Sequence, residues 1–275
     1  MNLDLGKTQQ ITKIPQMPST SLLEKLECTY CGKIFDSSKL NTVCTSCGKV
    51  LYPRYNLEKA KETLTPQKIQ MRKIYNIWRL QEIMPVIRTQ YRISLGEGWT
   101  PLISLKNLGD SYGLSNLQVK DEGQNPTGTF KSRGLSAAVS KALELGVQDF
   151  VIPSAGNAGA ALSAYTAHAG VNAHVFVPED TDPFIKTEIK RMGADLTLVK
   201  GLISDAGVKA KNAAEENGWW SVSTLKEPYR VEGKKTMGLE LAESLNWTLP
   251  DAIVYPTGGG TGIVGMWKAF DELEA

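Results

Sequence analysis

The chain has 275 residues, which is enough for a sizeable core and for one or two domains. Its 31 lysines and arginines nearly balance 29 aspartates and glutamates, so the net charge of +2 gives no support for nucleic acid or a membrane surface as a partner. No apolar run approaches the length of a membrane span, and the polar N-terminus MNLDLGKTQQITKIPQ is not a secretory signal, so we expect a cytoplasmic protein.

The first part of the chain combines a polar leader with a cluster of cysteines. Residues 1–21 are polar and contain two prolines, and we expect them to form a flexible leader. All four cysteines follow as two CxxCG motifs, a spacing that predicts a zinc-ribbon-like module over residues 22–55. Four thiolates around one zinc ion leave no open position, so the metal would be structural. The alternative is a module with four free thiols that binds no metal. The predicted ligands are Cys28, Cys31, Cys44 and Cys47.

Residues 53–92 have the character of a helical connecting region. The segment IYNIWRLQEIMPVIR has apolar residues at roughly helical spacing, and Pro85 is expected to end the helix. The next stretch, SLGEGWTPLISL at residues 94–105, has glycines that allow tight turns and then a β-branched run that suggests a strand.

From residue 117 onward, strand-like apolar runs alternate with helical segments. This alternation predicts an α/β fold with a mostly parallel sheet and helices on both faces. In such sheets ligands bind beyond the carboxyl ends of the strands, where the loops gather. The predicted strands are residues 117–120, 149–155, 173–178, 195–199, 220–222 and 252–257, and the predicted helices are residues 129–145, 158–169, 184–191, 204–217, 232–245 and a last helix from residue 261.

The stretch KDEGQNPTGTFKSRG, residues 120–134, joins a predicted strand to a predicted helix. Thr129 has a side chain suited to the N-cap, and Lys131 follows within the first turn. The N-terminal end of a helix carries partial positive charge, which lowers the pKa of an amine and favours its neutral, nucleophilic form. A neutral lysine is what imine chemistry with an aldehyde requires. Taken alone, Lys131 is better interpreted as an ordinary surface lysine in a first helical turn.

Two further loops each lie between a strand and a helix, where successive backbone N–H groups can bind an anion. The first is SAGNAG, residues 154–159, for which an N-cap at Asn157 is the structural alternative. The second is GGGTG, residues 258–262, whose glycines let the backbone wrap a phosphate. The spacing Gly260-x-Gly262-x-x-Gly265 also satisfies the dinucleotide fingerprint, but a dinucleotide explains only this one loop.

These motifs resemble those of the pyridoxal-phosphate enzymes related to tryptophan synthase β, and among them most closely the threonine synthase family. NPTGTFKSRG is similar to the family's NPTGSFKDRG, with Ser132 in place of the usual aspartate. SLGEGWTPL is similar to SLGEGxTPL, and PYRVEGKKT at residues 228–236 is similar to PxRxEGxKT. The resemblance covers residues 94–275. It implies a fold-type-II enzyme with pyridoxal 5′-phosphate as its cofactor.

The resemblance also implies roles for particular residues. Lys131 would bind the cofactor covalently and act as the general base. Asn157 would contact the 3-hydroxyl of the cofactor, and Arg230 would bind the phosphate of the substrate. We expect Glu232 and the two lysines after it to be solvated at the start of the next helix. The substrate carboxylate would be bound by Ser154, Ala155 and Gly156, and the cofactor phosphate by Gly258, Gly259, Gly260, Thr261 and Gly262.

The implied architecture has two domains behind the zinc-ribbon-like module. Residues 106–225 would form a small domain, and residues 56–105 with 226–275 would form an incomplete large domain of a C-terminally truncated chain. The implied reaction converts O-phospho-L-homoserine and water into L-threonine and phosphate, so the partner would be a small-molecule substrate. The resemblance also implies a homo-oligomer when the chain has its full length. Three alternatives stay open: a threonine or serine dehydratase, a β-replacement synthase such as one that makes cysteate, and a non-catalytic zinc-ribbon binding protein.

Overall fold

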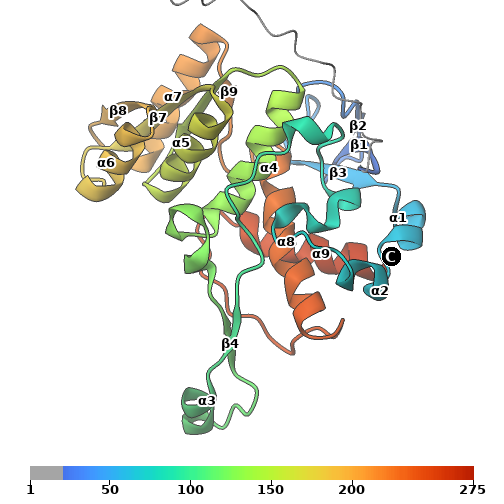
Figure 1. Cartoon of the computed structure of the whole chain (residues 1–275). Helices are drawn as coiled ribbons and strands as arrows, with labels where there is room; N and C mark the ends of the chain where they lie inside the picture. Colours follow the sequence, from blue (N-terminus) through green and yellow to red (C-terminus); the bar gives the residue numbers. More distant parts are fainter. Residues whose placement is uncertain (1–20) are drawn as a thin grey trace, which may run out of the picture.

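The computed structural model describes residues 21–275 (Figure 1). The leader expected at residues 1–21 lies, apart from its last residue, outside the described residues. Within the described part, no helix is both long enough and apolar enough to cross a membrane.

A four-stranded parallel sheet with helices on both faces forms the upper left part of the view in Figure 1. The strand order is β8-β7-β6-β9, and every neighbouring pair is parallel. The prediction of an α/β fold with a parallel sheet is therefore confirmed. The strands are β6 (Asp149–Pro153), β7 (Asn172–Pro178), β8 (Asp195–Val199) and β9 (Trp220–Ser221).

Successive side chains of these strands point to opposite faces of the sheet, and each face is covered. Phe150 and Ile152 of β6 pack in one core cluster with Ala160 of α5, whereas Val151 packs in another with Ala206 of α7. Because both faces are buried, the strands read as nearly continuous apolar runs. Each of the three helices here begins one residue earlier than predicted and ends at the predicted residue. They are α5 (Asn157–Ala169), α6 (Pro183–Arg191) and α7 (Ile203–Asn217).

The rest of the body is organised around one buried helix, α8, which packs against α4 and α9. Helix α8 begins earlier than the predicted residue 232, because the carboxylate of Glu227 accepts the backbone N–H groups of Tyr229 and Arg230 at 2.8 Å. The bounds are α4 (Lys131–Glu144), α8 (Tyr229–Ser244) and α9 (Thr261–Glu274).

Glu232, Lys234 and Lys235 of α8 are buried, so the expectation that these three side chains are solvated is wrong. Lys235 lies 2.8 Å from Glu232 and 2.7 Å from Glu272, and Lys268 lies 2.9 Å from Glu232. The hydroxyl of Tyr55 donates to Glu232 at 2.7 Å. Pairing and hydrogen bonding offset the cost of removing these charges from water.

The four cysteines belong to a small antiparallel sheet of order β2-β1-β3. Its strands are β1 (Leu23–Cys28), β2 (Ile34–Phe35) and β3 (Leu51–Tyr55). Helices α1 (Leu57–Thr63) and α2 (Pro66–Gln70) connect it to the body.

The segment IYNIWRLQEIMPVIR forms a 3-10 helix, η1 (Ile77–Ile83), instead of the regular helix suggested by its spacing. Leu80 interrupts it with φ −108° and ψ 52°, and the apolar side chains on both sides of this interruption are buried. A 3-10 helix places side chains at i and i+3 in the same direction, so it is the interruption at Leu80 that redirects the side chains on either side of it. A second 3-10 helix, η2 (Thr89–Tyr91), leads into residues 94–105.

Two predicted strands behave differently from expectation. The strand at residues 117–120 is confirmed as β5 (Gln118–Lys120), but it pairs antiparallel with β4 (Leu102–Ser104), outside the parallel sheet. Together with α3 (Lys106–Tyr112) this pair extends from the body (Figure 1). The prediction of a strand at residues 252–257 is wrong, because that segment has no regular secondary structure. A strand needs a hydrogen-bonded neighbour, and no strand within residues 21–275 pairs with this segment.

Candidate active site

Lys131 is the first residue of α4, and its side chain is partly buried. Its amine lies 3.7 Å from the centre of the Phe130 ring. Burial, helped by the nearby charge of Arg230, lowers the pKa of Lys131 to about 8. The expected N-cap is shifted, since the cap position is Phe130 and the Thr129 hydroxyl accepts the N–H of Lys131 at 3.2 Å. The amine is thus available in its neutral form at mildly alkaline pH.

Ser132, the residue that departs from the NPTGSFKDRG pattern, closes the loop in front of α4. Its hydroxyl donates to the carbonyl of Pro126 and lies 3.1 Å from the hydroxyl of Thr127, both in the 3-10 helix η4 (Pro126–Gly128). Thr127 has a φ of 59°, which a β-branched residue seldom adopts. The serine therefore supports an unusual turn just before Lys131.

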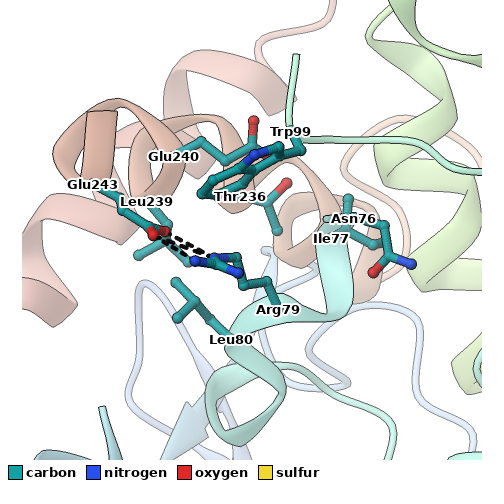
Figure 2. Close-up of a pocket in the computed structure, with 9 residues that line it drawn as sticks. All are labelled: Asn76, Ile77, Arg79, Leu80, Trp99, Thr236, Leu239, Glu240 and Glu243. Atoms are coloured by element: carbon teal, nitrogen blue, oxygen red, sulfur yellow. Dashed lines mark hydrogen bonds and ion pairs between the residues drawn. The ribbon is translucent and has the colours of Figure 1, made fainter. Parts of the chain in front are cut away.

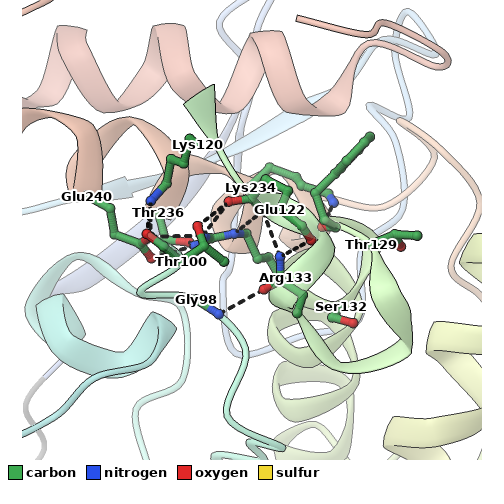
Figure 3. A network of polar contacts seen from close by, with 12 residues as sticks. Gly98, Thr100, Lys120, Glu122, Thr129, Ser132, Arg133, Lys234, Thr236 and Glu240 are labelled. Atoms are coloured by element: carbon green, nitrogen blue, oxygen red, sulfur yellow. Dashed lines mark hydrogen bonds and ion pairs between the residues drawn. The ribbon is translucent and has the colours of Figure 1, made fainter. Parts of the chain in front are cut away.

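A buried ion network behind Lys131 fixes α4 against α8 (Figure 3). The guanidinium of Arg133 donates to Glu122 at 2.7 Å and to Glu240 at 2.8 Å, and Lys120 lies 2.8 Å from Glu240. Burial by itself raises the pKa of Glu240, but the charges of Arg133 and Lys120 outweigh it and hold that pKa at about 2. Sequence analysis missed this network, because Lys120, Glu122 and Arg133 lie within residues 120–134 but their shared partner Glu240 is distant in the chain and carries no motif of its own.

The segment at residues 94–105 is tied to the lysine loop through one buried carboxylate and one glycine. Glu97 accepts 2.7 Å hydrogen bonds from the hydroxyls of Ser136 and Tyr165, which lie on α4 and α5. The N–H of Gly98 donates to the side chain of Asn125 at 3.0 Å. Gly98 has a φ of 94°, so its position favours glycine. The segment therefore has a fixed place beside the loop that precedes Lys131.

In the SAGNAG loop, the hydroxyl of Ser154 is turned inward. It accepts the backbone N–H groups of Gly156 at 3.0 Å and Gly159 at 2.9 Å. Gly156, with a φ of 136°, is the N-cap of α5, and Asn157 is the first helical residue, so the alternative of an N-cap at Asn157 is wrong. Helix α5 packs against η4, which places the loop on the same side of the fold as the lysine loop. Whether Ser154, Ala155 and Gly156 bind a substrate carboxylate stays a prediction.

Two glycines of the glycine loop lie so close to neighbouring residues that a side chain there would clash. A Cβ at Gly259 would lie 2.3 Å from the Thr224 methyl group, and a Cβ at Gly262 would lie 2.0 Å from the Tyr255 hydroxyl. Gly260 is the N-cap of α9 with a φ of 84°. The loop therefore presents bare backbone at a helix N-terminus, which is the arrangement that suits a phosphate.

Arg230 is buried on α8 beside this loop. Its guanidinium donates to the carbonyl of Val222 at 2.8 Å and to the hydroxyl of Thr224 at 3.3 Å. Its buried Nε has no hydrogen-bond partner within the described residues. No carboxylate in that part of the chain lies within 4.0 Å of the guanidinium, so Arg230 is a buried cation with donor capacity to spare.

Two cavities in the described part of the chain are lined by residues other than these predicted site residues. A cavity of about 440 Å³ beside Phe130 is lined mainly by apolar side chains of β5, α8 and residues 250–256. A recess of about 10 Å³ is lined by Arg79 and Glu243, which form an ion pair 2.8 Å long, and by the Trp99 ring (Figure 2).

The four cysteine sulfurs lie together and could hold a metal ion, since all are within 4.8 Å of one another. The sulfur separations are 3.4 Å for Cys28 and Cys47, 3.5 Å for Cys31 and Cys44, and 3.6 Å for Cys31 and Cys47. A tetrahedral zinc with Zn–S bonds of about 2.3 Å needs sulfurs about 3.8 Å apart. The cluster is thus close to the size that zinc requires.

The fold combines a lysine at a helix start, a glycine loop at a helix N-terminus and a parallel sheet, and this combination indicates a class of enzyme. Residues 93–275 match the family model described as pyridoxal-phosphate dependent enzyme, and the chain belongs to that family. The expected resemblance to threonine synthases is confirmed by the curated relatives. The threonine synthase of Methanocaldococcus jannaschii is 37% identical over 90% of this chain and 60% of its own length. That of Methanosarcina acetivorans is 32% identical over the same shares.

Solved structures agree with this assignment at the level of the fold. An L-serine ammonia-lyase from the fungus Rhizomucor miehei matches with a TM-score of 0.58 and 29% identity, over 64% of this chain and 56% of its own. The chain spans about 60% of the length of the two curated relatives. The fold-type-II assignment is confirmed.

Proposed function

We propose that this chain is the catalytic part of a threonine synthase, converting O-phospho-L-homoserine and water into L-threonine and phosphate. The observation that carries the proposal is the placement of Lys131. Its amine has a pKa of about 8 and lies near the buried cation Arg230, at the start of a helix. The curated relatives with this name support the choice of reaction.

The residues present fit pyridoxal phosphate, because the structure offers an amine for its aldehyde and a backbone cradle for its phosphate. When bound, this cofactor supplies a conjugated ring that stabilises a carbanion on the substrate. Lys131 would hold the aldehyde and then move the proton of the substrate Cα as general base. Gly258, Gly259, Gly260, Thr261 and Gly262 would hold the cofactor phosphate. Asn157 would contact the 3-hydroxyl, and Ser154, Ala155 and Gly156 the substrate carboxylate.

Arg230 would bind the substrate phosphate that leaves from Cγ, while water adds at Cβ. A guanidinium can donate two parallel hydrogen bonds to a phosphate. The buried Nε–H of Arg230 is free to donate one of them. Stabilising the departing charge in a site away from water is where such a residue contributes most.

A dehydratase is the second candidate, favoured by the unbroken run of three glycines at residues 258–260 and by the similarity to the serine ammonia-lyase. The experiment compares phosphate release from O-phospho-L-homoserine with keto-acid release from L-threonine and L-serine, in protein loaded with pyridoxal phosphate. Phosphate release together with threonine formation supports the proposal. Keto-acid release alone would make the chain a dehydratase.

The same preparation distinguishes the remaining candidates. A β-replacement synthase would release phosphate from O-phosphoserine and incorporate a nucleophile such as sulfite. A non-catalytic binding protein would give no visible imine absorbance band with pyridoxal phosphate. Lys131→Ala is the matched negative control for that band, and Lys141→Arg, on the same helix, should keep it.

We also propose that the cysteine module binds one structural zinc ion through Cys28, Cys31, Cys44 and Cys47, supported by the spacing of the four sulfurs. The division into a small domain at residues 106–225 and a large domain at residues 56–105 and 226–275 is likewise a proposal. A zinc content of about one ion per chain, lost in a cysteine variant, would support the first.

A further inference from the structure

Lys234 is a fully buried lysine on α8, one helical turn after Arg230. Its side chain runs through a slot between two glycines on neighbouring helices. A Cβ at Gly134 of α4 would lie 3.1 Å from the Lys234 Cε, and a Cβ at Gly265 of α9 would lie 2.8 Å from its Cβ. The fold thus reserves room for a long side chain that ends beside the start of α4.

The amine of Lys234 has no carboxylate partner within the described residues. It donates to the carbonyl of Phe130 and lies 4.1 Å from the centre of that ring. The ring is shared with Lys131, whose amine is 3.7 Å from the same centre. By contrast, the adjacent Lys235 is buried with carboxylates at 2.8 Å and 2.7 Å. Lys234 is therefore the buried lysine of α8 that lacks a countercharge.

The charged groups around Lys234 are mostly positive. Lys131 and Arg133 approach it from α4 and Arg230 from its own helix, and Glu122 of η3 (Glu122–Gln124) is the acidic group near it. Glu122 is already bound by Arg133 at 2.7 Å.

From α9, the residue packed against the Lys234 side chain is Gly265. The charged α9 residues Lys268 and Glu272 are engaged with Glu232 and Lys235. Burial, and then the charges of Lys131 and Arg230, hold the pKa of Lys234 well below its ordinary value.

We propose that Lys234 is the proton-accepting residue of the phosphate site: its amine is neutral while the site is empty and takes a proton from solvent when a phosphate group enters. This inference rests on the proposed function. An incoming dianion stabilises the ammonium form of a nearby amine, so anion binding and proton binding favour each other. The spare Nε of Arg230, one turn away, and the glycine loop at the start of α9 locate the anion.

Two sources could supply the phosphate group, namely the cofactor and the substrate, and two titrations distinguish them. In the first, pyridoxal phosphate is titrated into the cofactor-free protein. In the second, inorganic phosphate is titrated into the loaded protein. Calorimetry in buffers of different ionisation enthalpy gives the protons bound in each case. In the second titration Lys131 already holds the cofactor, so it takes up no proton there as a free amine.

The comparison variant is Lys234→Arg, because a guanidinium stays charged and has no proton to take up. We expect native protein to bind about one proton more than Lys234→Arg in one of the two titrations, and that titration identifies the phosphate. The contribution of Lys131 to the first titration is calculated from its pKa, measured separately in each protein, and is subtracted. Lys141→Arg is the matched control, since Lys141 is buried but lies 2.6 Å from Glu144, and it should behave as native.

Equal proton numbers for native protein and Lys234→Arg in both titrations would overturn the proposal, and so would the absence of any binding of inorganic phosphate and cofactor. If Lys234→Arg does not fold, Lys234→Met replaces it, with circular dichroism as the check on folding. If native protein shows an imine band but binds the same number of protons as Lys234→Arg in both titrations, only this inference is contradicted. The absence of an imine band in native protein defeats the proposed function.

Discussion

The hydroxyl of Tyr55 donates a 2.7 Å hydrogen bond to the buried carboxylate of Glu232. Tyr55 ends β3 of the cysteine module, whereas Glu232 lies on α8 between Arg230 and Lys234. The module that could hold a metal is thereby joined to the helix that carries two cations of the candidate site.

Removing the Tyr55 hydroxyl tests this link. Tyr55→Phe keeps the ring but leaves a buried charge with one partner fewer, and we expect it to lower the free energy of unfolding by about 1–3 kcal/mol. Urea denaturation followed by circular dichroism measures this. Tyr52→Phe, in the same strand, is the control, because the Tyr52 ring is only partly buried and its hydroxyl forms no hydrogen bond within the described residues. Equal stabilities of the two variants would contradict the role of the hydrogen bond.

Metal removal is expected to destabilise the cysteine module. Cys44 is buried, and Cys44→Ser removes one of four thiolates, so we expect loss of bound zinc and a lower Tm. Elemental analysis and a thermal melt with and without a chelator check the result. Thr45→Ala, one residue away, should keep both the metal and the Tm. A chelator that leaves the native Tm unchanged argues against a structural metal.

The reactivity of Lys131 should follow its lowered pKa. The neutral amine attacks an aldehyde, so its fraction rises as the pH rises through the pKa of about 8. We expect borohydride trapping of pyridoxal phosphate on Lys131 to reach half its maximum near that pH, well below the value of about 10.4 for an ordinary lysine. Peptide mapping by mass spectrometry locates the label. A midpoint at the ordinary value would rule out the lowered pKa, and Lys131→Ala should abolish the label.

Acid stability should report on Glu240. Its pKa is lowered from 4.5 to about 2, so its contribution to stability is fully present above pH 4.5 and is lost as the pH falls towards 2. At about 1.36 kcal/mol for each pKa unit, the contribution is roughly 3 kcal/mol. Glu240→Gln should therefore lose most stability at neutral pH and match native protein more closely in acid. A constant difference between the two across this pH range would contradict the assignment.

The glycine loop allows a matched pair of substitutions. Gly259→Ala would place a Cβ 2.3 Å from the Thr224 methyl group, whereas Gly258→Ala meets nothing within 4 Å. We expect Gly259→Ala to weaken the binding of pyridoxal phosphate at least tenfold, because about 1.4 kcal/mol of distortion in the loop is enough for that loss. Fluorescence titration gives the Kd. Equal Kd values for the two variants would show that the loop backbone does not set cofactor affinity.

Several features were predictable because they depend on residues close together in the chain. The cysteine spacing, the glycines that open or close helices, and the apolar runs of β6, β7 and β8 are local signals. A helix at residues 129–145 was likewise expected, and α4 begins two residues later and ends one residue earlier than that prediction. The 3-10 helix η1 was not predicted, because the apolar spacing of a short segment does not distinguish a 3-10 helix from an α-helix.

What the sequence by itself determined is the class of fold and the chemistry on offer: a lysine at a helix start, loops suited to anions, and four thiolates in pairs. Only the tertiary structure decided which charges are buried together. Lys234 and Lys235 are adjacent in the chain and identical in type, yet only Lys235 has carboxylate partners. Helix α9 brings Glu272 to Lys235, whereas the start of α4 brings the carbonyl of Phe130 to Lys234. A countercharge is supplied by whichever segment packs there, and that depends on contacts between residues far apart in the chain.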